Sequence, residues 1–82
     1  MNTQELRKAI ELALAGKWDE SHQIVQQYDD PYACWVHAVL HKIEGDEGNS
    51  RYWYNRTGKA SAHTNPEEEL RDILSELTAP HA

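Results

Sequence analysis

The sequence has little of what secreted and membrane-spanning proteins depend on, with one cysteine, Cys34, and no long apolar run in 82 residues. A single thiol cannot form an intramolecular disulfide, so we expect a reducing compartment and a cytoplasmic protein. The longest apolar run, 33–40, is interrupted by His37 and is far shorter than the about 20 residues that span a bilayer. The polar first residues lack the apolar core of a signal peptide, so we expect no secretion signal.

Basic residues are also scarce, with 8 Lys and Arg against 14 Asp and Glu and a net charge of −6 at pH 7. Phosphate backbones and anionic lipids attract positive charge, so this balance disfavours nucleic acid and membrane surfaces as partners. One basic and aromatic run, 51–56, would suit a base-stacking surface, but on a helix its side chains point in different directions. We therefore expect Trp53 and Tyr54 in the core. Tyr52 and Arg56 would form a polar rim that could bind an acidic peptide or a carboxylate.

What the sequence does contain is a weak internal repeat with an offset of 29 residues. Each copy has an apolar stripe at helical spacing, a glycine, and a second stripe that begins near a serine. The matching positions are Leu6, Ile10, Leu14, Gly16, Ser21 and Val25 in the first copy and Trp35, Val39, Ile43, Gly45, Ser50 and Tyr54 in the second. This pattern is typical of a helical hairpin that stacks on a copy of itself.

Helical periodicity and capping residues predict one all-α domain over residues 1–82. Its parts are a hairpin over about 3–28, a second hairpin over about 31–58 and a C-terminal capping helix over about 66–78. Asp30-Pro31 and Asn65-Pro66 would start helices, as would Asn2, and Pro80 would follow the last one. We expect the two antiparallel hairpins to stack as a short solenoid. The apolar stripe of the capping helix would pack on the fourth helix or on a second copy, and its acidic face would be solvated.

The segments 16–21 and 45–50 resemble the inter-helix turn of tetratricopeptide and Sel1-like repeats. In those families a glycine occupies the turn, and a small residue that follows it, here Ser21 or Ser50, lets the two helices approach closely. The resemblance covers about 3–58 and implies a scaffold that binds a protein or peptide and has no catalytic activity. A second stretch, 37–54, also resembles small bacterial proteins to which no activity is attached.

The leading functional hypothesis is therefore a non-catalytic interaction module that binds a protein or peptide in a groove between the hairpins. The residues expected to line this groove are Trp18, Trp35, His37, His41, Tyr52 and Arg56. Short helical stacks leave an open apolar end, so a homodimer is a further expected assembly. No glycine-rich phosphate loop or serine elbow accompanies these residues, and we assign no residue a catalytic role.

The alternative hypothesis is a metal-binding protein, either a sensor or a metal-dependent enzyme, that holds a divalent transition metal. His37 and His41 are four residues apart on one predicted helix, the spacing that lets two imidazoles reach one ion. Glu44 continues their stripe, and His22 on the preceding helix is the obvious further ligand. The helical angle points this stripe away from the apolar face, toward solvent or a neighbouring helix. A metal site needs His22 within about 4–5 Å of the pair, whereas a groove needs the histidines spread along a concave surface.

Overall fold

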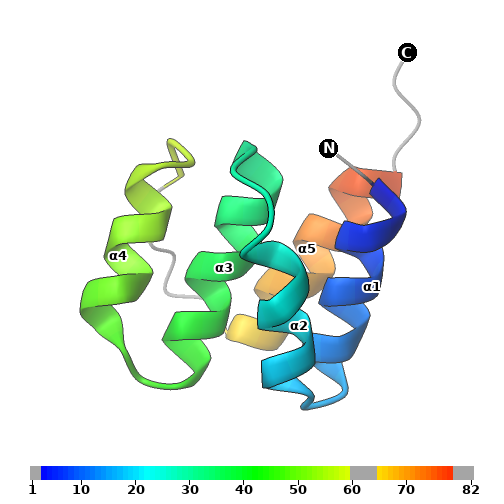
Figure 1. Ribbon diagram of the computed structural model, residues 1–82, viewed down its shortest axis with the longest axis horizontal. Helices are drawn as coiled ribbons and strands as arrows, with labels where there is room; N and C mark the ends of the chain where they lie inside the picture. The colour runs from blue at the N-terminus through cyan, green and yellow to red at the C-terminus, as the bar shows by residue number, and fades with distance from the viewer. Residues whose placement is uncertain (1–2, 60–64, 79–82) are drawn as a thin grey trace.

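The computed structural model describes residues 3–59 and 65–78, and within these ranges the chain forms five α-helices and no strand. They are α1 (Thr3–Leu14), α2 (Trp18–Val25), α3 (Pro31–Ile43), α4 (Glu47–Asn55) and α5 (Pro66–Thr78), shown in Figure 1. The all-α prediction is confirmed. None of these helices is long and apolar enough to cross a membrane. The helix signals expected at Asn2 and Pro80 lie outside the described residues.

The helices begin where side chains cap their free backbone N–H groups. The Asp30 carboxylate accepts a hydrogen bond from the Ala33 backbone N–H at 3.2 Å, and Pro31 is the first residue of α3. The Asn65 side-chain oxygen likewise accepts from the backbone N–H of Glu67 at 2.8 Å, which starts α5. Both predicted starts are therefore confirmed, because Asp, Asn and Pro at these positions suit a helix N-terminus.

The α1–α2 and α3–α4 pairs contain the same two local features. The Ser21 hydroxyl donates to the Ala9 carbonyl at 2.6 Å, and the Ser50 hydroxyl donates to the Ala38 carbonyl at 2.8 Å. Both serines are buried, so each bond ties the second helix of its pair closely to the first. The turns before them contain Gly16 and Gly45, whose φ angles of 81° and 84° favour glycine.

Helix α3 is the centre of the molecule, because it packs against each of the other four helices. Every residue from Ala33 to His41 is buried, so the helix is enclosed around its whole circumference. The sequence led us to expect one buried face, with the histidine stripe toward solvent or a neighbouring helix. Its two histidines are buried rather than solvated, because α2 and α4 cover the side of α3 that carries His37.

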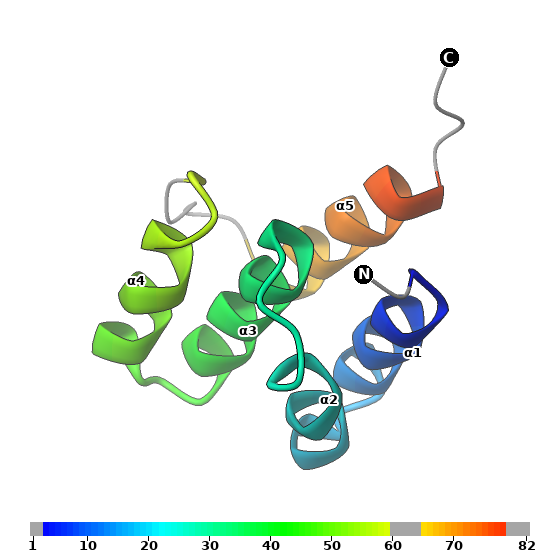
Figure 2. The same cartoon turned by 45° about the horizontal axis from the view of Figure 1, so that its top comes forward.

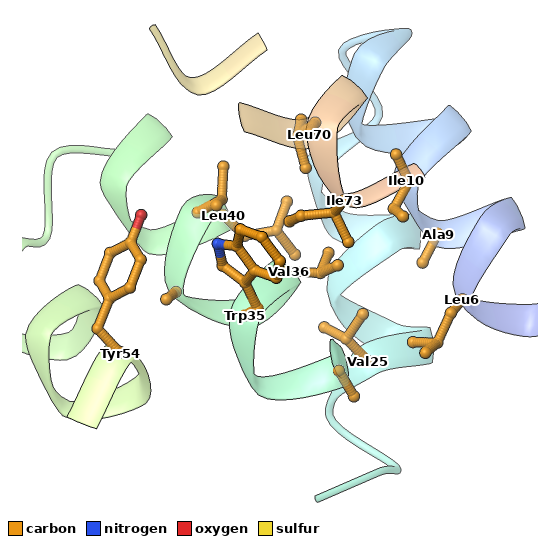
Figure 3. Packing of buried hydrophobic residues seen from close by; sticks show 13 residues of the cluster. Leu6, Ala9, Ile10, Val25, Trp35, Val36, Leu40, Tyr54, Leu70 and Ile73 are labelled. Atoms are coloured by element: carbon orange, nitrogen blue, oxygen red, sulfur yellow. The ribbon is translucent and has the colours of Figure 1, made fainter. Parts of the chain in front are cut away.

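Helix α5 packs against α1 and α3. Figures 1 and 2 together show α2 and α5 on opposite sides of the α1 and α3 helices. Leu70 and Ile73 are fully buried, and Figure 3 shows their side chains among those of Val36, Leu40 and Ile10. The prediction that this apolar stripe packs on the fourth helix is wrong. Its apolar side chains fill the seam between α1 and α3 instead, and a hydrogen bond from the Tyr54 hydroxyl to Glu69 links α4 to α5.

Glu69 is a buried carboxylate that joins three helices. Its Oε2 accepts hydrogen bonds from Trp35 Nε1 at 2.8 Å and from the Tyr54 hydroxyl at 2.7 Å, and Lys42 Nζ lies 2.8 Å from Oε1. Burial, followed by the contact with Glu69, raises the pKa of Tyr54 and keeps its hydroxyl a donor. The acidic face of α5 was expected to be solvated. Glu69 departs from this expectation because three donors compensate the cost of burying its charge.

Candidate metal site

Three histidines from two helices converge between α2 and α3. His22 lies on α2, and His37 and His41 lie one turn apart on α3. Nε2 of His22 is 3.1 Å from Nε2 of His37, and ligand atoms from all three side chains lie within 4.8 Å of one another. His37 is only 4 % exposed and His41 only 8 %, while His22 is partly buried. The sequence criterion for a metal site, the approach of His22 to the other two, is met.

This convergence follows from the local fold. A spacing of four residues places His37 and His41 on one face of α3, where their ring centroids are 5.0 Å apart. The turn at Gly16 reverses the chain so that α2 runs beside α1 and also contacts α3. His22 lies one turn into α2 and therefore faces the histidine pair, with its ring centroid 4.7 Å from that of His37.

A different neighbour supports each imidazole ring. Trp18 stacks on His22 at 4.7 Å and an interplanar angle of 12°, and its Nε1 donates to the Leu40 carbonyl at 2.6 Å. Trp53, on α4, stacks on His37 at 3.9 Å and also at 12°. Glu44 Oε1 lies 2.6 Å from Nδ1 of His41. Because their neighbours are packed or hydrogen-bonded, the three rings are held in place before any ligand arrives.

The environment of the cluster favours neutral imidazoles. Burial first, and then the neighbouring His22 and His41, lower the pKa of His37 to about 4. The pKa of His22 is also lowered, mainly by burial and then by His41, although Glu44 and Asp19 act in the opposite direction. His22 and His37 are therefore unprotonated at neutral pH, which is the form of imidazole that binds a metal ion.

One nitrogen of the cluster has no partner among the residues that the structure describes. Nδ1 of His37 is fully buried and makes no hydrogen bond there. An unpaired buried polar atom costs about 1–3 kcal/mol, and an apolar side chain in its place would avoid this cost. Costly arrangements of titratable groups are concentrated at functional sites, so the cluster is the strongest candidate for one within residues 3–59 and 65–78.

The spacing of the His22 and His37 nitrogens fits a transition-metal ion. Zinc binds imidazole nitrogen at about 2.0–2.1 Å in tetrahedral geometry, so two ligand nitrogens lie about 3.3 Å apart. The observed 3.1 Å between His22 and His37 is close to that value. Glu44, which the sequence suggested as a ligand, does not join this group. It belongs to a second, more exposed group with His41 and Asp46, through its contact with Nδ1 of His41.

The residues expected to line a peptide groove are separated into three places. Trp18, His37 and His41 belong to the histidine cluster. Tyr52 is 52 % exposed on α4, with the Arg56 guanidinium 5.9 Å from its ring centroid, and Trp53 lies between this pair and His37. Trp35 is hydrogen-bonded to Glu69 of α5, with Lys59 Nζ 4.5 Å above its ring.

Sequence reasoning missed the supporting role of the two tryptophans. Trp18 precedes His22 by four residues, a spacing that places both on one face of a helix and could have signalled the stack. Trp53 was assigned to the core with Tyr54, whereas it is only partly buried and covers His37. No local signal links Trp53 to His37, because the contact joins two different helices.

Comparisons of the chain with protein-family models, with curated proteins and with solved structures give no match. The function is therefore inferred from the residues of this chain.

Proposed function

We propose that the protein binds one divalent transition-metal ion, with Zn²⁺ the first candidate, between α2 and α3 through His22, His37 and His41. The observation that carries this proposal is the convergence of three imidazoles, with ligand atoms within 4.8 Å of one another. A peptide groove would need these histidines spread along a surface. Their convergence therefore favours metal binding over the interaction module that the repeat resemblance implies.

The chemistry of the ligands narrows the choice of ion. Imidazole suits Zn²⁺, Cu²⁺, Ni²⁺ and related ions, whereas Mg²⁺ and Ca²⁺ prefer carboxylate, carbonyl and water oxygens. The ion would take up the lone pairs of His22 Nε2 and His37 Nε2, which without it share one hydrogen bond at 3.1 Å. Because His22 is on α2 and the other two are on α3, the ion would also tie these helices together.

We also propose that the α1–α2 and α3–α4 pairs are two copies of a tetratricopeptide-like hairpin. The equivalent bonds of Ser21 and Ser50, with glycine turns at Gly16 and Gly45, support this assignment. Here α5 packs against both first helices, α1 and α3. A cytoplasmic location remains part of the proposal and rests on the single cysteine, Cys34.

The test is direct metal binding by tag-free protein stripped of metal with a chelator. Isothermal titration calorimetry and elemental analysis should find one Zn²⁺ per chain. His22→Ala, His37→Ala and His41→Ala should each weaken binding by more than the about 10–100-fold that loss of a supporting residue causes. Gln23→Ala, at an exposed position next to His22, is the control and should bind as the wild type does.

Two results would overturn the proposal. The first is wild-type protein that binds none of Zn²⁺, Co²⁺, Ni²⁺ and Cu²⁺ with 1:1 stoichiometry. The second is Zn²⁺ binding that His22→Ala leaves unchanged, because the cluster cannot then be the site. Circular dichroism of each metal-free variant checks that the helices are present before binding is compared.

A further inference from the structure

We infer that Glu44 is a positioning residue of the proposed site, which holds His41 so that its Nε2 faces the ion, and is not itself a ligand. This inference rests on the proposed metal binding and adds to it a residue and a role. The observation behind it is the contact of 2.6 Å between Glu44 Oε1 and Nδ1 of His41.

The position of Glu44 is fixed by the end of helix α3. Glu44 is the C-cap residue, with φ −81° and ψ −1°, and its backbone N–H donates to the Leu40 carbonyl at 3.2 Å. The same carbonyl accepts the hydrogen bond from Trp18 Nε1, so one backbone group anchors the supports of two different histidines. Glu44 follows His41 by three positions, and this spacing brings the carboxylate over the ring.

The geometry of imidazole separates the roles of support and ligand. The two ring nitrogens point in different directions, so a group that contacts Nδ1 cannot share an ion with Nε2 of the same ring. A carboxylate that accepts from Nδ1–H fixes the proton on that nitrogen and leaves the Nε2 lone pair for a metal. Histidine ligands in metal sites commonly have such an outer partner.

Glu44 is the carboxylate that supports this cluster by hydrogen bonding. Among the described residues, His22 is supported by stacking on Trp18, and His37 has Trp53 against its face and no partner at Nδ1. The orientation of the His41 ring therefore depends on a carboxylate, that of Glu44. The orientation of the His22 and His37 rings depends on aromatic stacking instead. The Glu44 side chain is 40 % exposed, whereas that of His41 is 10 % exposed, so Glu44 can be changed with little effect on the packing around the cluster.

The experiment compares Glu44→Ala, Glu44→Gln and a control, Glu47→Gln, which removes the same charge from a nearby exposed position. Zn²⁺ dissociation constants are measured by competition with a chromophoric chelator, and the visible spectrum of the Co²⁺-loaded protein reports ligand geometry. We expect Glu44→Ala to weaken Zn²⁺ binding about 10–100-fold at unchanged 1:1 stoichiometry, with an altered Co²⁺ spectrum. Glu44→Gln should lose less, because its amide oxygen still accepts from Nδ1–H. Glu47→Gln should match the wild type.

Other outcomes overturn the inference in distinguishable ways. Wild-type affinity and an unchanged Co²⁺ spectrum in Glu44→Ala would show that Glu44 positions nothing. A loss as large as that in His41→Ala, without rescue by Glu44→Gln, would make Glu44 a direct ligand. A wild-type protein that binds no ion would refute the proposed function, and this inference with it. If Glu44→Ala fails to fold, the near-isosteric Glu44→Gln still tests the role through its affinity and spectrum.

Discussion

The metal-free protein should become less stable as the pH is lowered below about 6.5, because of one buried histidine, His37. The pKa of His37 is lowered from 6.5 to about 4 in the folded state, chiefly by burial. The unfolded chain therefore binds more protons than the folded chain between these values. The stabilising contribution of neutral His37 is complete above the unfolded pKa of 6.5 and is lost as pH falls through the folded pKa.

The size of this effect follows from the pKa difference. Each unit is worth about 1.4 kcal/mol, so the full loss would approach about 3 kcal/mol below pH 4, and about 2 kcal/mol of it falls between pH 7 and pH 5. For a domain whose total stability is about 5–10 kcal/mol, this is a large fraction. The free energy of unfolding is measured by urea denaturation in the presence of a chelator at several pH values.

A His37→Gln variant isolates the contribution of His37 from those of the carboxylates. Its stability should fall by about 2 kcal/mol less than that of the wild type between pH 7 and pH 5, whatever its absolute stability. The difference between the two pH profiles is the quantity to be compared. Parallel profiles would refute the reasoning that burial keeps His37 neutral.

Three further predictions concern the core, the repeat and the metal. Glu69→Ala should destabilise by about 2–6 kcal/mol in urea denaturation, since it removes the acceptor of two buried donors, Trp35 Nε1 and the Tyr54 hydroxyl. The exposed Glu68→Ala should change stability by less than about 0.5 kcal/mol, and equal effects would contradict the buried role of Glu69. Ile10→Ala and Val39→Ala, at equivalent repeat positions and fully buried, should each cost about 1–4 kcal/mol, and unchanged melting temperatures would contradict the repeat. Zn²⁺ at 100 times its dissociation constant should stabilise the protein by about 2.7 kcal/mol, and addition of a chelator should reverse the rise in melting temperature.

The local part of the fold could be predicted from the sequence because its signals are local. Asp30 and Asn65 cap the helices that they were expected to cap, and both glycine turns lie where the pattern indicated. The centrality of α3 could not be predicted, because periodicity describes one helix in isolation and not the number of helices that cover it. The position of α5 was mistaken for the same reason, since an apolar stripe does not specify which seam it fills.

The sequence allowed us to predict which histidines form the candidate site. It did not allow us to predict their burial or the side chains that pack around them. The spacing of His37 and His41 indicated that both could reach one ion, and His22 was named as the further donor. Their burial, and the stacking of Trp53 on His37, depend on contacts between helices that no sequence spacing encodes. Glu44 was assigned to the ligand set because it continues the stripe, whereas the structure places it against the outer nitrogen of His41.

Helix α3 contributes to two buried polar clusters, one around Glu69 and one around His37. They differ in how many of their polar atoms have hydrogen-bond partners. Around Glu69, both carboxylate oxygens have partners, from Trp35, Tyr54 and Lys42. Linking three helices is therefore a sufficient structural role for this cluster. Around His37, two imidazole nitrogens face each other at 3.1 Å, and among the described residues a third nitrogen has no partner. A buried cluster that exists only to stabilise a fold gains from completing its bonds. The histidine cluster leaves Nδ1 of His37 without a partner among the described residues, so fold stability alone does not account for it, and this supports the proposal that the cluster has a binding role.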